Sequence, residues 1–168
     1  MTAVSPSASA PTSVTVAGVT YTIASPSVAY QLASLSGGGV GQVVSQIHLG
    51  GGTPTFLSDE GLRDLMGMLR NHFTLVPGGE YSIEVDPRTV DADRLAVLHG
   101  LGFNRLSFGV QDFDPEVQKA VHRVQPAEQV FALVEAARSI GFDSINVDLI
   151  YGLPRQTPES FQRTLAQV

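Results

Sequence analysis

From residue 44 onward, the spacing of apolar residues alternates between the pattern of strands and the pattern of helices. Short runs in which apolar residues alternate with polar ones, or fill both faces, predict strands. The expected strands are 44–49, 81–86, 106–111 and 144–150. Longer runs with apolar residues at helical spacing predict helices that open near residues 58, 91, 114, 126 and 157. A chain that alternates strands and helices in this way forms a parallel sheet with right-handed crossovers, so the predicted fold class is α/β.

Capping residues mark where these helices begin and end. Ser58 and Asp114 have side chains suited to an N-cap, and Asp114 is followed by a proline at the first helical position. Gly141 is expected to close the helix before the fourth strand. The Pro-Gly-Gly triplet at 77–79 is expected to break the chain ahead of the second strand. No stop signal follows the last helix, which we expect to run to Val168 as part of a longer chain.

A glycine-rich turn, Gly50-Gly51-Gly52-Thr53-Pro54, follows the first expected strand. Three consecutive glycines remove every Cβ, so backbone groups can approach a ligand closely. Turns at the carboxyl ends of strands are where α/β folds bind ligands. The alternative is a loop in which glycine serves only turn geometry. The other glycine run, 37–41, does not fit the G-x-G-x-x-G dinucleotide pattern, and no P-loop motif occurs.

Polar residues recur at the matching ends of the later strands. They are Glu84, Gln111 and Asp148. Four βα units are compatible with an open doubly wound sheet or with part of a βα barrel, and in a barrel this end is the active-site face. Strand alternation places Glu84 opposite to Ile83 and Val85, where a barrel lumen would accommodate a carboxylate and a helix-covered face would not. A structural hydrogen bond is a competing explanation for each residue alone, but the set at equivalent positions favours a binding site.

The composition bounds the class of protein. The 168 residues carry a formal net charge of −6, a pI near 5.0 and a mean hydropathy of +0.12, values that suit one globular domain. This acidic balance gives no reason to expect a nucleic-acid partner, and no apolar run is long enough to cross a membrane. No secretory signal is evident, so we expect a cytoplasmic protein. The absence of cysteine excludes disulfides, thiolate nucleophiles and thiolate-bound metal centres.

Charge is distributed unevenly along the chain. Residues 1–58 contain no Lys, Arg, Asp or Glu, and the first charged side chain belongs to Asp59. We therefore divide the chain into an uncharged low-complexity segment, 1–36, and a domain, 37–168. Within the first segment, 14–16 and 19–23 show weak β periodicity, which predicts a disordered or weakly β-prone tail.

The remaining polar groups form no recognisable constellation. The four histidines lack metal-ligand spacing, and we expect most of them at the surface or at helix ends. They are His48, His72, His99 and His122. Arg123 is a candidate partner for an anionic ligand. We therefore predict neither a metal site nor a catalytic residue in this chain.

Five motifs occur in a fixed order along the chain. They are Gly50-Gly51-Gly52-Thr53-Pro54-Thr55, Ile83-Glu84-Val85-Asp86-Pro87-Arg88, Phe103-Asn104-Arg105-Leu106-Ser107, Gly109-Val110-Gln111-Asp112-Phe113 and Asp148-Leu149-Ile150-Tyr151-Gly152-Leu153-Pro154. From about residue 35 to residue 168, this set closely resembles the oxygen-independent coproporphyrinogen III oxidases, which are radical S-adenosylmethionine enzymes of heme biosynthesis. The related heme chaperones typically have Asn in place of Asp86 and Ser in place of Asp112, and this chain resembles the oxidases at both positions.

The resemblance implies a partial parallel (βα) barrel of the radical S-adenosylmethionine type, of which about four βα units are present here. Carried over residue by residue, it implies that S-adenosylmethionine binds at Gly51, Gly52, Thr53, Glu84, Gln111, Arg123 and Asp148. It further implies reductive cleavage of this cofactor by a [4Fe–4S] cluster, and oxidative decarboxylation of two propionate side chains of coproporphyrinogen III to vinyl groups. The implied partners are the porphyrinogen substrate and an electron donor. We expect a monomer that binds neither nucleic acid nor membrane.

The chain departs from the family pattern in its cysteines. The family carries a C-x₃-C-x₂-C motif upstream of the glycine turn, and this chain has no cysteine. The family's C-terminal substrate domain also has no counterpart. We therefore expect an inactive fragment; the alternatives are a non-catalytic remnant that binds S-adenosylmethionine or porphyrin, or a relative of the heme chaperones. The uncharged start suggests that residues 1–30 are an out-of-frame translation, an idea that fails if no upstream reading frame encodes C-x₃-C-x₂-C.

Overall fold

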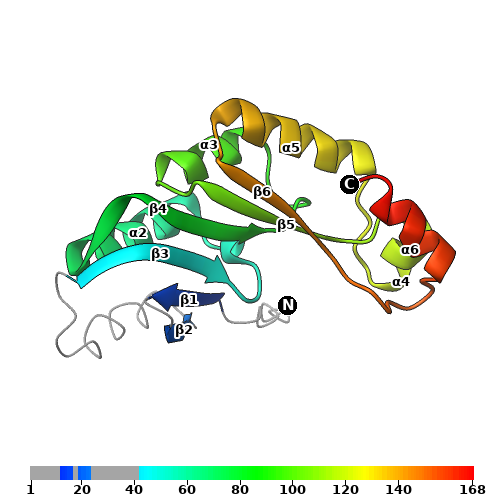
Figure 1. The fold of residues 1–168 in the computed structure, drawn as a ribbon, viewed down its shortest axis with the longest axis horizontal. Helices are drawn as coiled ribbons and strands as arrows, with labels where there is room; N and C mark the ends of the chain where they lie inside the picture. The colour runs from blue at the N-terminus through cyan, green and yellow to red at the C-terminus, as the bar shows by residue number, and fades with distance from the viewer. Residues whose placement is uncertain (1–11, 17–18, 24–41) are drawn as a thin grey trace, which may run out of the picture.

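One twisted sheet organises the chain in the computed structural model, which describes residues 12–16, 19–23 and 42–168 (Figure 1). Its strand order is β2-β1-β3-β4-β5-β6. The strands are β1 (Thr12–Val16), β2 (Val19–Ile23), β3 (Gln42–Gly50), β4 (Phe73–Val85), β5 (Arg105–Gln111) and β6 (Ser144–Leu149). The four strands from β3 to β6 pair in parallel, while β1 pairs antiparallel with both β2 and β3.

Helices follow each of the four parallel strands. They are the short 3₁₀ helix η1 (Pro54–Phe56), α2 (Asp59–His72), α3 (Ala92–Gly100), α4 (Pro115–Ala120), α5 (Ala127–Ile140) and α6 (Pro158–Leu165). The predicted caps are present: the Ser58 hydroxyl accepts a hydrogen bond from the Gly61 N–H at 3.1 Å, and Gly141 ends α5 with a φ of 108°. The expected α/β fold with four βα units is confirmed.

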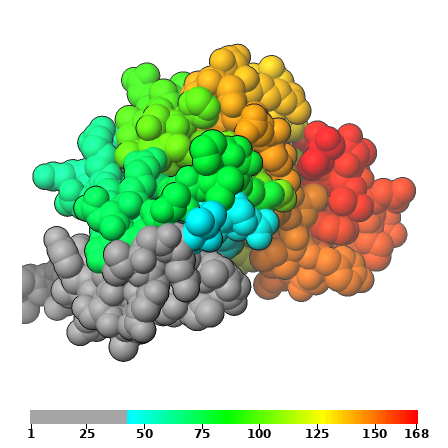
Figure 2. All heavy atoms as spheres, turned by 60° about the vertical axis from the view of Figure 1, so that its left-hand side comes forward, coloured from blue at the N-terminus to red at the C-terminus, as the bar shows by residue number. Residues whose placement is uncertain are grey.

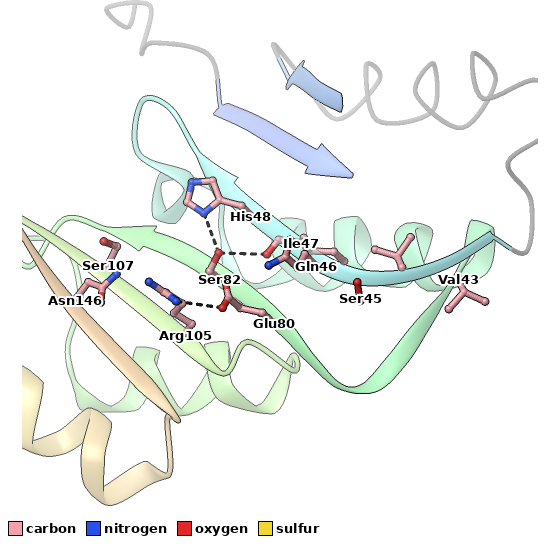
Figure 3. A pocket seen from close by; sticks show the side chains of 11 residues that line it. Val43, Ser45, Gln46, Ile47, His48, Glu80, Ser82, Arg105, Ser107 and Asn146 are labelled. Atoms are coloured by element: carbon pink, nitrogen blue, oxygen red, sulfur yellow. Dashed lines mark hydrogen bonds and ion pairs between the residues drawn. The ribbon is translucent and has the colours of Figure 1, made fainter. Parts of the chain in front are cut away.

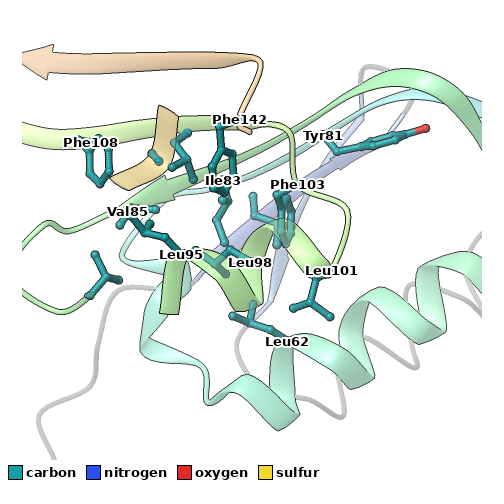
Figure 4. Packing of buried hydrophobic residues seen from close by; sticks show 14 of the residues in the cluster. Leu62, Tyr81, Ile83, Val85, Leu95, Leu98, Leu101, Phe103, Phe108 and Phe142 are labelled. Carbon is teal, nitrogen blue, oxygen red and sulfur yellow. The ribbon is translucent and has the colours of Figure 1, made fainter. Parts of the chain in front are cut away.

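The helices α2, α3 and α5 cover one face of the sheet, and the core lies between them and the strands. Strand residues such as Ile83 and Phe108 are fully buried there with helix residues such as Leu62 and Leu95 (Figure 4). Val130 of α5 belongs to the same core. Burying one such side chain is worth about 1.5–3 kcal/mol. Residues at the alternate strand positions lie on the opposite face, which is predominantly polar and hollowed by a cavity of about 440 Å³. The alternation predicted for the second strand is therefore confirmed.

β4 is longer than the sequence predicts. The triplet 77–79 does not interrupt the strand, because β4 continues on both sides of it as one element. Pairing with β3 shifts between Val44↔Leu75 and Gln46↔Glu80, so residues 76–79 form a bulge in which Gly78 has a φ of 77°. Glycine adopts this backbone conformation at little cost, and a bulge lets the ladder continue where a break was expected.

The two β-prone stretches of the N-terminal segment form β1 and β2, at the edge of the sheet next to β3. The rest of that segment lies outside the described residues, so the boundary at residue 36 stays a prediction. At the other end of the sequence, α6 ends at Leu165 rather than at Val168. Its last turn tightens, because the Gln167 N–H bonds to the Thr164 carbonyl at 3.1 Å.

The carboxyl ends of β5 and β6 lead towards α4 and α6, which lie together beyond the strands (Figure 1). Figure 2 shows α6, in red, at one end of the molecule, with α5, in yellow and orange, above it. In the described part of the chain, no helix combines the length and apolar character needed to cross a bilayer.

Candidate functional site

A hollow of about 140 Å³ lies at the carboxyl ends of the parallel strands. Six of the seven residues predicted from the sequence line it: Gly52, Thr53, Glu84, Gln111, Arg123 and Asp148. The seventh, Gly51, joins them through a hydrogen bond from its N–H to Glu84 Oε2 at 3.1 Å. The sequence did not predict Asp86, which also lines the hollow, although strand alternation places it on the same face as Glu84.

The glycine turn needs glycine for two different reasons. Gly51 and Gly52 have φ values of 73° and 62°, in the left-handed region that side chains disfavour. Gly50 has no such φ, but a Cβ built on it would lie 2.4 Å from His48 Nε2 and 2.7 Å from Glu84 Oε1. The turn therefore allows the imidazole and the carboxylate to pack directly over its backbone.

His48 lies within β3, as the strand predicted at 44–49 implies, on the polar face of the sheet. Its side chain is 45% exposed, as expected for most of the histidines, but its contacts on β4 were not predicted. Its Nε2 is 3.3 Å from Glu84 Oε1, and its Nδ1 is 2.8 Å from the Ser82 hydroxyl. Parallel pairing aligns His48 with Ser82, a register that pattern reading alone does not supply.

A buried carboxylate, Asp86, joins two guanidinium groups beside the hollow. Asp86 Oδ2 lies 2.6 Å from Arg88 Nη2 and 3.3 Å from Arg123 Nη2. Burial raises the pKa of the Asp86 carboxyl, but the hydrogen bonds from Arg88 and the positive charges of Arg123 and Arg88 outweigh it, so the pKa lies below its ordinary value. Asp86 is therefore an anion that holds Arg123 at the wall of the hollow, where Arg123 also donates to the Gly109 carbonyl at 2.8 Å.

Two buried polar atoms at this site have no hydrogen-bond partner within the described residues. They are Gln111 Oε1 and Arg123 Nε. Gln111 also has a φ of 73°, a left-handed conformation that costs a residue with a side chain about 1–2 kcal/mol. Unsatisfied buried groups and backbone strain of this kind concentrate where a ligand binds.

Asp148, on β6, completes the ring of polar groups. Its carboxylate accepts a hydrogen bond from the Ser107 hydroxyl at 2.7 Å, and the side chain is otherwise exposed. Carboxylates such as Glu84 and Asp148 can accept hydrogen bonds from an ammonium group or from hydroxyl groups, and a guanidinium such as Arg123 can donate to a carboxylate. The hollow thus suits a small zwitterion with attached hydroxyls.

The loop after β6 is held to the end of β5 by Asp112, which is 1% exposed. One carboxylate oxygen accepts from the Thr164 hydroxyl at 2.6 Å and from the Asp114 N–H at 2.7 Å; the other accepts from Gln156 Nε2 at 2.6 Å. Gln156 in turn accepts from the Gly152 N–H at 2.5 Å. The predicted cap role of Asp114 is present, and Asp112 links the end of β5 to both the loop after β6 and α6.

This chain lacks the donor atoms that an iron–sulfur cluster requires. The sequence contains no cysteine, and the residues that the structure describes include no group of three His, Cys, Asp or Glu side chains placed to hold a metal. The polar hollow, with its unsatisfied amide and guanidinium atoms, does suit an organic zwitterion. We therefore assign no step to a cluster on this chain.

Known proteins resemble this chain over most of its length. It is 58% identical to the oxygen-independent coproporphyrinogen III oxidase of Pseudomonas aeruginosa over 129 residues, which are 76% of this chain and 28% of that protein. It is 56% identical over 128 residues to the Escherichia coli protein of the same name, with the same coverage. The chain therefore spans little more than a quarter of the length of these relatives.

A solved structure has the same arrangement of elements. The coproporphyrinogen III oxidase from Escherichia coli, described as a radical SAM enzyme, superposes with a TM-score of 0.76 at 51% identity, covering 84% of this chain and 32% of that one. Residues 36–168 match the model of the radical SAM superfamily. This match covers all four parallel strands and the entire polar hollow. The chain belongs to the radical SAM superfamily.

Proposed function

We propose that the hollow at the carboxyl ends of β3 to β6 binds S-adenosylmethionine. The observation that carries this proposal is the convergence of the glycine turn, two carboxylates and a guanidinium in one hollow, with unsatisfied buried atoms on Gln111 and Arg123. Glu84 and the adjoining glycine backbone face the amino group of the methionyl part. Arg123 faces its carboxylate, and Asp148 accepts hydrogen bonds from ribose hydroxyls.

We further propose that the chain represents the cofactor-binding part of an oxygen-independent coproporphyrinogen III oxidase. Its similarity to two proteins of that name, at 58% and 56% identity, supports this substrate class. In such an enzyme the bound cofactor supplies the radical chemistry that oxidises the propionate side chains of the porphyrinogen. This chain's residues bind and orient the cofactor. The whole protein would act in the cytoplasm as a monomer with an electron donor, without nucleic acid or membrane.

The isolated chain is proposed to be inactive, because three thiolates hold the cluster in the family and this sequence has no cysteine. The test is anaerobic reconstitution with iron and sulfide, followed by absorption spectroscopy and an assay for cofactor cleavage. A colourless protein without cleavage products is expected. A cluster band with cofactor turnover would contradict the proposal.

A non-catalytic remnant that retains cofactor binding is the second candidate, and the missing cysteines favour it. Isothermal titration calorimetry with S-adenosylmethionine tests the binding that both candidates share. We expect saturable one-site binding, weakened about tenfold or more by Arg123→Gln, since a hydrogen bond to a charged group is worth about 1.5–3 kcal/mol. The exposed Arg155→Gln serves as the control and should bind like the unaltered chain. Absence of binding heat would contradict the proposal.

A further inference from the structure

Three side chains form a hydrogen-bonded row across β3 and β4 on the polar face of the sheet. The Ser82 hydroxyl lies 2.8 Å from His48 Nδ1, and His48 Nε2 lies 3.3 Å from Glu84 Oε1. Figure 3 shows the imidazole of His48 extending from β3 towards Ser82 on β4. The row thus leads from the interior of the sheet to the rim of the hollow that contains Glu84.

The contacts with Glu84 and Ser82 hold the imidazole of His48 at both ring nitrogens. A carboxylate accepts hydrogen bonds, so the contact with Glu84 requires a hydrogen on Nε2. Nδ1 is hydrogen-bonded to the Ser82 hydroxyl at 2.8 Å, and this hydroxyl lies 3.3 Å from its other partner, the Ile47 carbonyl. Because Ser82 is buried, water does not compete for the hydrogen bonds of its hydroxyl.

The other charged side chains near His48 have partners of their own, and Glu84 is the carboxylate that His48 contacts. On the same cavity wall, Arg105 pairs with Glu80 at 3.1 Å. Asp148, across the sheet, accepts from Ser107. Glu84 is held from two sides, by His48 at Oε1 and by the Gly51 N–H at Oε2. Both contacts depend on the close approach that Gly50 allows.

We propose that His48 is a positioning residue, anchored by Ser82, that orients the Glu84 carboxylate towards the glycine turn for the ammonium group of S-adenosylmethionine. This inference rests on the proposed function. His48 does not contact the ligand itself. Its effect on affinity is therefore confined to ligands that carry the amino-acid part, because these alone engage Glu84.

The test compares two ligands and three substitutions by calorimetry on the full chain. His48→Phe removes the donor, and it should raise the dissociation constant of S-adenosylmethionine about three- to tenfold, as for loss of one half-exposed charged hydrogen bond. His48→Gln keeps an N–H near the position of Nε2 and should recover most of the affinity. Binding of 5′-methylthioadenosine, which lacks the amino-acid part, should not change. The matched control His72→Phe, on α2, should leave both ligands unaffected.

A double-mutant cycle separates this inference from the proposed function. In a Glu84→Gln background, His48→Phe should cost little further affinity, because its partner has lost the carboxylate. If Glu84→Gln weakens S-adenosylmethionine but neither His48 variant does, only the positioning role is overturned. If Glu84→Gln itself has no effect, the proposed site is overturned as well. Equal weakening of both ligands by His48→Phe would indicate a general effect on the site and would overturn the positioning role.

Discussion

The Asp86 carboxylate and the Arg123 guanidinium lie 3.3 Å apart, and the same oxygen of Asp86 also binds Arg88 at 2.6 Å. One buried anion thus holds two cations, and the side chain of Asp86 is only 7% exposed. Arg123 can face a ligand carboxylate because Asp86 fixes its position while its Nε remains without a partner in the described part of the chain. Asp86 is also one of the two positions at which the sequence resembles the oxidases rather than the heme chaperones.

The substitution Asp86→Asn should lower the free energy of unfolding by about 1–3 kcal/mol, since it leaves two guanidinium groups without their anion. Urea denaturation followed by circular dichroism measures this change. The control is Glu116→Gln, which breaks the exposed pair with Lys119 and should leave stability unchanged. Equal losses of unfolding free energy in both variants would show that the buried Asp86 cluster stabilises the fold no more than an exposed ion pair does.

The stability that Asp86 contributes should depend on pH. Its pKa in the folded protein lies below the ordinary value of 3.8, which represents the unfolded chain. The contribution is therefore complete above about pH 3.8 and is lost as the pH falls through the lower, folded value. Urea denaturation of the unaltered chain and of Asp86→Asn should show a constant difference from neutral pH to about pH 5 and a shrinking one in stronger acid. A difference that grew with acidification would contradict the assigned pairing.

Asp112→Ser should release the loop after β6. Three donors, from Asp114, Gln156 and Thr164, would lose their acceptor, and we expect a loss of about 1–3 kcal/mol in the free energy of unfolding. Amide hydrogen exchange at Gly152 and along α6 should accelerate, because Gln156 would no longer be fixed. Thr164→Ser keeps the hydroxyl and should retain most of the protection. Unchanged exchange in Asp112→Ser would show that the loop is held by other contacts.

The glycine turn should tolerate little change at Gly51. Gly51→Ala imposes a side chain at a φ of 73°, which costs about 1–2 kcal/mol and displaces the N–H that binds Glu84. Both thermal stability and S-adenosylmethionine affinity should fall. Gly100→Ala is the control, since a Cβ there meets nothing within 4 Å and the residue is helical. It should be neutral or slightly stabilising, and a loss as large as that of Gly51→Ala would contradict the turn's special role.

Much of the fold could be predicted because it depends on local signals. Hydrophobic period and capping residues placed the four parallel strands and the starts of the helices, as at Ser58. The bulge in β4 was missed because Pro-Gly-Gly marks a turn by itself, and only pairing with β3 shows that the strand continues. The use of β1 at the edge of the sheet depends on a long-range pairing that weak β periodicity cannot specify.

The residues of the candidate site were predictable where they lie at or next to the last residue of a strand, as Glu84, Gln111 and Asp148 do. Arg123 lies in the turn after α4, and it was carried over from a family resemblance rather than from any periodicity. The place of Asp86 in the hollow and the role proposed for His48 were not predicted, because both depend on partners on a neighbouring strand or turn. Strand register and ion pairing are properties of the folded chain, and one sequence contains no direct signal for either.

Amide chemical shifts of the ¹⁵N-labelled chain during titration with S-adenosylmethionine report whether the ligand occupies the hollow. We expect saturable shifts at Gly51, Gly52, Gln111 and Asp148, with amides such as Leu65 on α2 unmoved. Shifts confined to residues outside the hollow, or no shifts at saturating ligand, would contradict the proposed binding site.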